Sequence, residues 1–140
     1  MNIKVYMKAF MSWATAQPDI EGVALAGSYA RGTATENSDV DLMILTLERA
    51  RYLENEDWLS LFGKIERSTD QRWGDVKTIR ATYKTGLEVE YNFATPSWAA
   101  VPVDAGTRRV LNDGMKILYD PTGILEALRN AVFAEGPALN

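Results

Sequence analysis

Two aspartates, Asp39 and Asp41, lie at the start of an otherwise apolar stretch, VDLMILT. In a β-strand, residues two apart point to the same side, so the two carboxylates would stand next to each other. Like charges this close repel, and burial would remove their hydration, so a cation between them is favoured. An all-oxygen site suits Mg²⁺ or Mn²⁺. The alternative is that the pair marks an exposed edge of a sheet.

A Gly-Ser pair, Gly27 and Ser28, precedes Asp39 by a polar loop. The pair ends an apolar run, IEGVALA, and leads into a predicted helical turn, whose backbone N–H groups would point toward an anion. Glycine lets a phosphate approach the backbone closely, and the serine hydroxyl adds a donor. Arg31 could reach the same phosphates or could be solvated. A phosphate cradle beside a metal-binding pair is a site for a nucleoside triphosphate.

The elements that position these residues are two short strands and a hairpin. The strands are IEGVALAG from Ile20 and VDLMILT from Val40. The segment DVKTIRATYKTGLEVEYNFA alternates on both sides of KTG, and Gly86 suits the left-handed position of a three-residue turn. This register places Arg80 opposite Glu90 and gathers the apolar residues on one face.

Helices are predicted at both ends of the sequence. Ile3, Met7, Phe10, Met11 and Ala14 have helical spacing and would form one buried face. A short helix is predicted at Glu56–Phe62, ended by Gly63. In the last third, a helix is predicted over 104–113, a strand at MKILY and a final helix at PTGILEALRNAVFA. This pattern predicts an α+β fold, a mixed β-sheet with helices packed mainly on one face, in a single domain over residues 1–140.

Composition restricts the chemistry. The chain has 140 residues, 46% of them hydrophobic, and a formal net charge of -4 from 15 basic and 19 acidic residues. That balance argues against binding long nucleic acid. Because the sequence has neither cysteine nor histidine, catalysis would depend on carboxylates and hydroxyls. No apolar run is long enough to span a membrane and Lys8 splits the N-terminal apolar segment, so we expect a cytoplasmic protein.

The sequence GSYARGTATENSDVDLMIL resembles the G-S-x10-D-x-D signature of the DNA polymerase beta superfamily of nucleotidyltransferases. It is similar to the small prokaryotic members, the antibiotic nucleotidyltransferases and the minimal MNT-type proteins. The resemblance implies a polymerase beta-like core in which Gly27 and Ser28 bind the nucleotide, and Arg31 in the loop between them and the aspartates is a further candidate for binding it. It implies that Asp39 and Asp41 bind Mg²⁺ or Mn²⁺.

The family takes a third carboxylate from a later strand, and GLEVEYNF has the matching pattern. Glu88 and Glu90 share a face there, so both are candidates. We favour Glu90, because VEYNF resembles the small-molecule nucleotidyltransferases and Arg80 is predicted beside it. Glu90 would bind the catalytic metal, act as general base, or do both.

The resemblance implies transfer of a nucleoside monophosphate, AMP from ATP or another NTP, to a hydroxyl of a small molecule such as an antibiotic. The alternative is an MNT-type antitoxin that binds or nucleotidylates a HEPN-like toxin protein. A third hypothesis, nucleotide binding without catalysis, is disfavoured because the acidic residues are present. A core this small could complete its acceptor site as a homodimer or with a HEPN-like partner.

Overall fold

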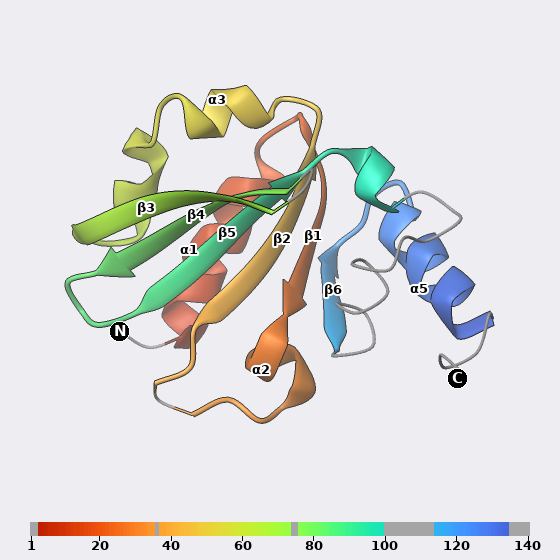
Figure 1. Ribbon diagram of the computed structural model, residues 1–140, viewed down its shortest axis with the longest axis horizontal. Helices are drawn as coiled ribbons and strands as arrows, with labels where there is room; N and C mark the ends of the chain where they lie inside the picture. The colour runs from red at the N-terminus through yellow and green to blue at the C-terminus, as the bar shows by residue number, and fades with distance from the viewer. Residues whose placement is uncertain (1–2, 36, 74–75, 100–113, 135–140) are drawn as a thin grey trace.

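The computed structural model describes residues 3–35, 37–73, 76–99 and 114–134. Its centre is a six-stranded mixed sheet in the order β3-β4-β5-β2-β1-β6 (Figure 1). The strands are β1 (Ile20–Ala26), β2 (Val40–Thr46), β3 (Ile65–Trp73), β4 (Val76–Tyr83), β5 (Glu88–Ala94) and β6 (Met115–Tyr119). Neighbouring strands are antiparallel except β2 and β5, which run parallel. The α+β prediction is confirmed.

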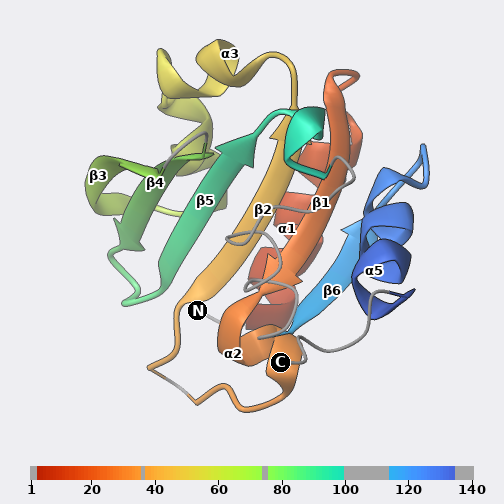
Figure 2. The same cartoon turned by 45° about the vertical axis from the view of Figure 1, so that its right-hand side comes forward.

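Of the helices that the structure describes, three line one face of the sheet. Helix α1 (Ile3–Thr15), helix α3 (Arg49–Leu53) and the 3₁₀ helix η1 (Asp57–Phe62) enclose the larger core there. On the opposite face, α5 (Ile124–Ala134) and the short η2 (Pro96–Ala99) lie toward the β1–β6 side, whereas α2 (Gly27–Arg31) follows directly from β1. Figure 2 shows α1 behind the sheet and α2 and α5 in front of it. The front face between α2 and β4 carries the polar residues considered below.

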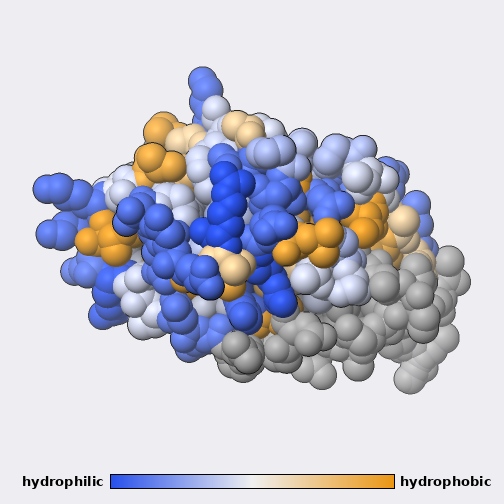
Figure 3. Space-filling view, turned by 90° about the horizontal axis from the view of Figure 1, so that it is seen from above, coloured by the Kyte–Doolittle hydropathy of each residue, from blue (hydrophilic) through white to orange (hydrophobic). Residues whose placement is uncertain are grey.

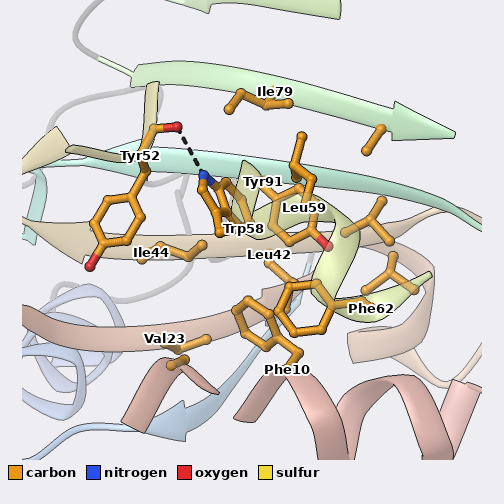
Figure 4. Close-up of a cluster of buried hydrophobic side chains, with 14 of the residues drawn as sticks. Phe10, Val23, Leu42, Ile44, Tyr52, Trp58, Leu59, Phe62, Ile79 and Tyr91 are labelled. Atoms are coloured by element: carbon orange, nitrogen blue, oxygen red, sulfur yellow. Dashed lines mark hydrogen bonds between the residues drawn. The ribbon is translucent and has the colours of Figure 1, made fainter. Parts of the chain in front are cut away.

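Aromatic rings dominate the larger core (Figure 4). Trp13 and Trp58 stack with ring centroids 5.0 Å apart, and Phe10 and Phe62 pack beside them at 5.9 Å from each other. The Trp58 indole donates to the Tyr52 carbonyl at 2.9 Å, so its polar atom is satisfied within the core. These rings cover the inner face of β2 and β5 and fix the strands that carry the acidic residues.

A chain of hydroxyl groups crosses the same core. The Tyr6 hydroxyl donates to that of Tyr91 at 2.6 Å, Tyr91 and Tyr83 hydroxyls lie 2.9 Å apart, and Tyr83 donates to the Leu59 carbonyl at 2.9 Å. Each hydroxyl has one proton to donate, so Tyr91 must be the donor to Tyr83. The chain therefore runs in one direction from α1 through the sheet to η1.

The predicted hairpin register is confirmed. Arg80 pairs with Glu90 and Ala81 with Val89. Gly86 has φ +95°, the left-handed conformation that glycine adopts without a Cβ clash. The inward-facing residues Ile79, Ala81, Tyr83, Val89 and Tyr91 are all fully buried.

The remaining predicted helices and strands can be compared with those of the structure. The β1 and β2 strands and the first helix are confirmed, although the helix also buries Tyr6, which was not among the predicted residues. The short helix before Gly63 is a 3₁₀ helix, and the MKILY strand and the last helix are present. The helix predicted over 104–113 lies outside the described residues. Strand β3 and helix α3 were not predicted.

Exposed large hydrophobic side chains among the described residues are scattered rather than grouped. They are Val5 in α1, Leu47 in the loop after β2 and Leu61 in η1. In Figure 3, the face seen from above carries hydrophobic side chains in separate groups between hydrophilic ones. Single exposed apolar residues are normal for globular proteins. Within the described residues, no helix combines the length and apolar character needed to cross a membrane.

Candidate active site

The turn that was predicted to form a phosphate cradle lies at the end of β1. Gly27 begins α2 directly after Ala26 and has φ +69°. A Cβ on Gly27 would lie 3.5 Å from the Asp41 Cβ and 3.6 Å from its Oδ2. The turn is therefore in van der Waals range of a site carboxylate, and any side chain at position 27 would project between them.

Ser28 lies in the first turn of α2, and its carbonyl accepts hydrogen bonds from Thr33 and from the Gly32 cap. Arg31 ends the helix and is exposed. A Cβ on Gly114 would approach the Arg31 Cγ to 2.9 Å, so the stem of this arginine packs beside the start of β6. The structure thus brings Gly27 next to the aspartates, whereas the arginine lies at the far end of the same turn.

Four carboxylates share the front face where β2 and β5 meet. In the parallel register, Asp41 lies beside Glu90, and Asp39 and Glu88 each lie two positions earlier on their strands. The sequence separates these two pairs widely, and the parallel pairing of β2 and β5 brings them together. The prediction that Asp39 and Asp41 share a side is supported, because both are in electrostatic contact with Arg80.

The carboxylates perturb one another. Burial raises the pKa of Asp39, and a hydrogen bond with Glu88 and its negative charge raise this pKa further, while Arg80 opposes the shift. Burial also raises the pKa of Asp41, with added repulsion from Glu90 and Asp39. Carboxyl groups that hold protons more tightly because of their neighbours are typical of sites that need an extra cation.

Arg80 supplies positive charge to this cluster from β4. Its guanidinium hydrogen-bonds and ion-pairs with Glu90, its cross-strand partner, and its Nη2 lies 3.8 Å from the Asp39 Oδ2. Glu90 raises the pKa of Arg80, so the guanidinium is fully ionised. The Arg80–Glu90 pair predicted from the hairpin register is therefore confirmed.

Asn92 holds Asp41 in place and was not predicted. Its Nδ2 donates to the Asp41 Oδ1 at 2.6 Å and to the Leu42 carbonyl at 2.9 Å, while its Oδ1 accepts from the Thr78 hydroxyl at 2.6 Å. The Asn92 bond lowers the pKa of Asp41 against the effect of burial and favours its charged form. The only sequence signal was that Asn92 follows Glu90 by two residues and so shares its face.

The donor set fits a divalent cation in chemistry and charge. Asp39, Asp41 and Glu90 offer hard oxygen ligands on adjacent strands, and the mutual repulsion that raises the Asp41 pKa would be relieved by added positive charge. Among the described residues, no three acidic side chains converge closely enough to hold a metal as they stand. Glu90, the register partner of Asp41, is already ion-paired with Arg80.

Comparison with known families assigns the chain to a class of protein. A nucleotidyltransferase domain model matches residues 8–91, a range that includes the Gly-Ser turn, both aspartates and both glutamates. The chain therefore belongs to the nucleotidyltransferase domain family. None of the curated protein sequences is significantly similar to it.

The solved structures that match the chain have low sequence identity to it. An aminoglycoside 6-adenyltransferase from Bacillus subtilis is 19% identical with a TM-score of 0.55, and the match covers 67% of this chain and 35% of that one. A toxin-antitoxin structure with AMP-PNP is 15% identical with a TM-score of 0.47, over 96% of this chain and 86% of that one. A nucleotidyltransferase-like protein from Exiguobacterium sibiricum is 14% identical with a TM-score of 0.46, and the match covers 92% of this chain and 37% of that one.

The first of these likenesses confirms the polymerase beta-like fold. The chain spans about a third of the length of that adenyltransferase.

Proposed function

We propose that the protein transfers AMP from ATP to a hydroxyl group of a small molecule, with Mg²⁺ as cofactor. The observation that carries the proposal is the placement of Asp39, Asp41 and Glu90 on the face where β2 and β5 meet, with Asp41 in contact range of the Gly27 turn. This combines ligands for a hard cation with a backbone that a phosphate can approach closely. Mn²⁺ and other nucleoside triphosphates have the same chemistry and are alternatives.

The reaction is a displacement at the α-phosphorus. The acceptor oxygen forms a bond to that phosphorus, the bond to the bridging oxygen of the β-phosphate breaks, and pyrophosphate leaves. When bound, the divalent cation neutralises charge on the triphosphate. Asp39, Asp41 and Glu90 would hold it, and Gly27, Ser28 and Arg31 would hold the phosphates.

A general base is needed to take the proton of the acceptor hydroxyl. We assign this role to Glu90, which lies beside Asp41 in the register and has an exposed side-chain fraction of 21%. Asn92 acts as a positioning residue for Asp41, because it fixes one carboxylate oxygen and leaves the other for the ligand.

The proposal also covers the domain organisation, the acceptor, and the location and oligomeric state of the protein. Residues 1–140 form one nucleotidyltransferase unit, supported by a single sheet that extends from β1 to β6 and by helices that pack on it from both ends of the chain. The acceptor is a small molecule such as an antibiotic, and a protein hydroxyl of a HEPN-like partner is the alternative. The cytoplasmic location and a homodimeric state stay predictions from the sequence.

The test uses ATP labelled at the α-phosphate. The purified protein is incubated with labelled ATP and Mg²⁺, with a panel of antibiotics in one series and with cell lysate in another. Transfer of label to a small molecule supports the proposal, and transfer to a protein supports the alternative acceptor. Asp39→Asn and Asp41→Asn should abolish transfer, whereas Asp57→Asn, at an exposed acidic residue in η1, should not. Transfer that survives both site substitutions would overturn the assignment.

A further inference from the structure

Arg80 takes up a position that the proposed reaction does not explain. It belongs to β4, and its guanidinium reaches over to β5 and β2, where it ion-pairs with Glu90 and lies 3.8 Å from Asp39. Two of the carboxylates assigned to the metal therefore already have a cationic partner. A cation bound by those carboxylates would have to replace this partner or share it.

One atom of Arg80 has no partner. Its Nε is buried and has no hydrogen-bond partner among the described residues, although the side chain as a whole is 42% exposed. A buried N–H without an acceptor costs free energy and is uncommon in folded proteins. The guanidinium is thus satisfied on its Nη2 side and unsatisfied at Nε, so the carboxylate contacts do not use its full set of donors.

The chemistry of arginine suits a second partner. The guanidinium presents five donors in a planar fork that matches carboxylate and phosphate oxygens equally well. It cannot lose its charge in a protein, so it remains a cation in every state of the site. A triphosphate that enters beside Gly27 would bring acceptor oxygens to the face on which Arg80 lies.

We propose that Arg80 exchanges partners: it pairs with Glu90 and Asp39 when no divalent cation is bound, and with phosphate oxygens of the nucleotide once the cation occupies those carboxylates. This inference rests on the proposed function, because it uses the same site. Arg80 would lower the affinity for the free cation and raise the affinity for the cation–nucleotide complex. The site would then favour the two ligands together over the cation alone.

The test measures Mn²⁺ binding directly, by the electron paramagnetic resonance signal of free Mn²⁺, in the presence and absence of ATP. Arg80→Gln removes the internal cation and should bind Mn²⁺ alone at least about fivefold more tightly than the unmodified protein. With Mn²⁺ present, the same variant should bind ATP at least about fivefold more weakly. Lys84→Gln, in the exposed turn of the β4–β5 hairpin, removes the same charge away from the site and should change neither affinity.

A second variant keeps the test decisive if Arg80→Gln folds poorly. Arg80→Lys retains the charge but loses the Nε donor and the planar fork, so it should bind Mn²⁺ alone nearly as the unmodified protein does and bind ATP more weakly. Mn²⁺ affinity that is unchanged or reduced in Arg80→Gln would overturn the inference. If Asp39→Asn and Asp41→Asn still abolish Mn²⁺ binding in that case, the proposed function stands. If they leave Mn²⁺ binding unchanged, the metal site itself is wrong.

Discussion

Replacing Gly27 by alanine tests the phosphate cradle. The residue has φ +69° and stands against Asp41, with the position of a Cβ 3.5 Å from the Asp41 Cβ and 3.6 Å from its Oδ2. These are ordinary contact distances, so the new methyl group would not collide with the aspartate. It would fill the space between the turn and the carboxylate, which the proposal assigns to a phosphate group.

The Gly27→Ala substitution should have two effects on Tm, one from backbone strain and one from weaker nucleotide binding. Holding a non-glycine residue in the left-handed region costs about 1–2 kcal/mol, which for a chain of this length lowers Tm by about 3–7 °C. A ligand at 100 times its Kd stabilises the folded protein by about 2.7 kcal/mol, or about 9 °C. If the methyl group weakens nucleotide binding about tenfold, about 1.4 kcal/mol of that gain is lost.

The assay is thermal unfolding with and without ATP and Mg²⁺. Gly123→Ala is the matched control, because Gly123 has φ +76°, nothing lies within 4 Å of its Cβ position, and it precedes α5 away from the acidic face. Without ligand, both variants should lose a similar amount of Tm. With ligand, Gly123→Ala should gain as much as the unmodified protein, and Gly27→Ala about 5 °C less.

If Gly27→Ala gains as much Tm from ATP and Mg²⁺ as Gly123→Ala, no phosphate approaches the backbone at position 27. The cradle would then have to be sought elsewhere on the acidic face.

Three other predictions concern the third carboxylate and the stability of the fold. Glu90→Gln should reduce turnover at least about 10²-fold, as expected for loss of a general base, and Glu88→Gln less than about tenfold; the reverse order in a pyrophosphate-release assay would assign the role to Glu88. Burial opposes ionisation of Asp19, but hydrogen bonds from Tyr52 and Thr46 and the charge of Arg51 outweigh it and hold the pKa of this carboxyl below its ordinary 3.8. Asp19→Asn should therefore lower the free energy of unfolding at neutral pH by about 1.5–3 kcal/mol, and the difference in urea midpoints should shrink as the pH falls through that lowered pKa; a constant difference would contradict it. Burial raises the pKa of Tyr83 from 10.0 to about 12, so the contribution of this tyrosine to stability is complete below the unfolded pKa and is lost as the pH rises toward the folded pKa. The urea concentration at the unfolding midpoint should therefore decrease as the pH is raised from 10 to about 12. A midpoint that does not change over this pH range would be evidence against the buried hydroxyl chain.

Much of the sheet was predictable because its signals are local. The strands around Val40 and the β4–β5 hairpin have strict alternation and one glycine with a clear conformational role, Gly86. Those features also fix which residues share a face, so the Arg80–Glu90 pair followed from the register.

The elements that were not predicted lack such signals. Strand β3 has polar residues on both sides from Glu66 to Arg72 and no apolar alternation. It is an edge strand that pairs with β4 along its whole length, and backbone pairing of this kind leaves no mark on side-chain type. Asn92 was missed for a different reason, because its partner Asp41 comes from a distant segment through the parallel β2–β5 pairing.

The parallel pairing of β2 with β5 also has a consequence for how the protein folds. The two strands are joined through α3, η1 and the β3–β4 hairpin, so the acidic residues meet only after a long loop has closed. Closing such a loop costs chain entropy before any contact between its ends is gained. A ligand that bridges Asp41 and Glu90 ties the ends of that loop together, and we expect ATP with Mg²⁺ to slow unfolding by more than it accelerates refolding.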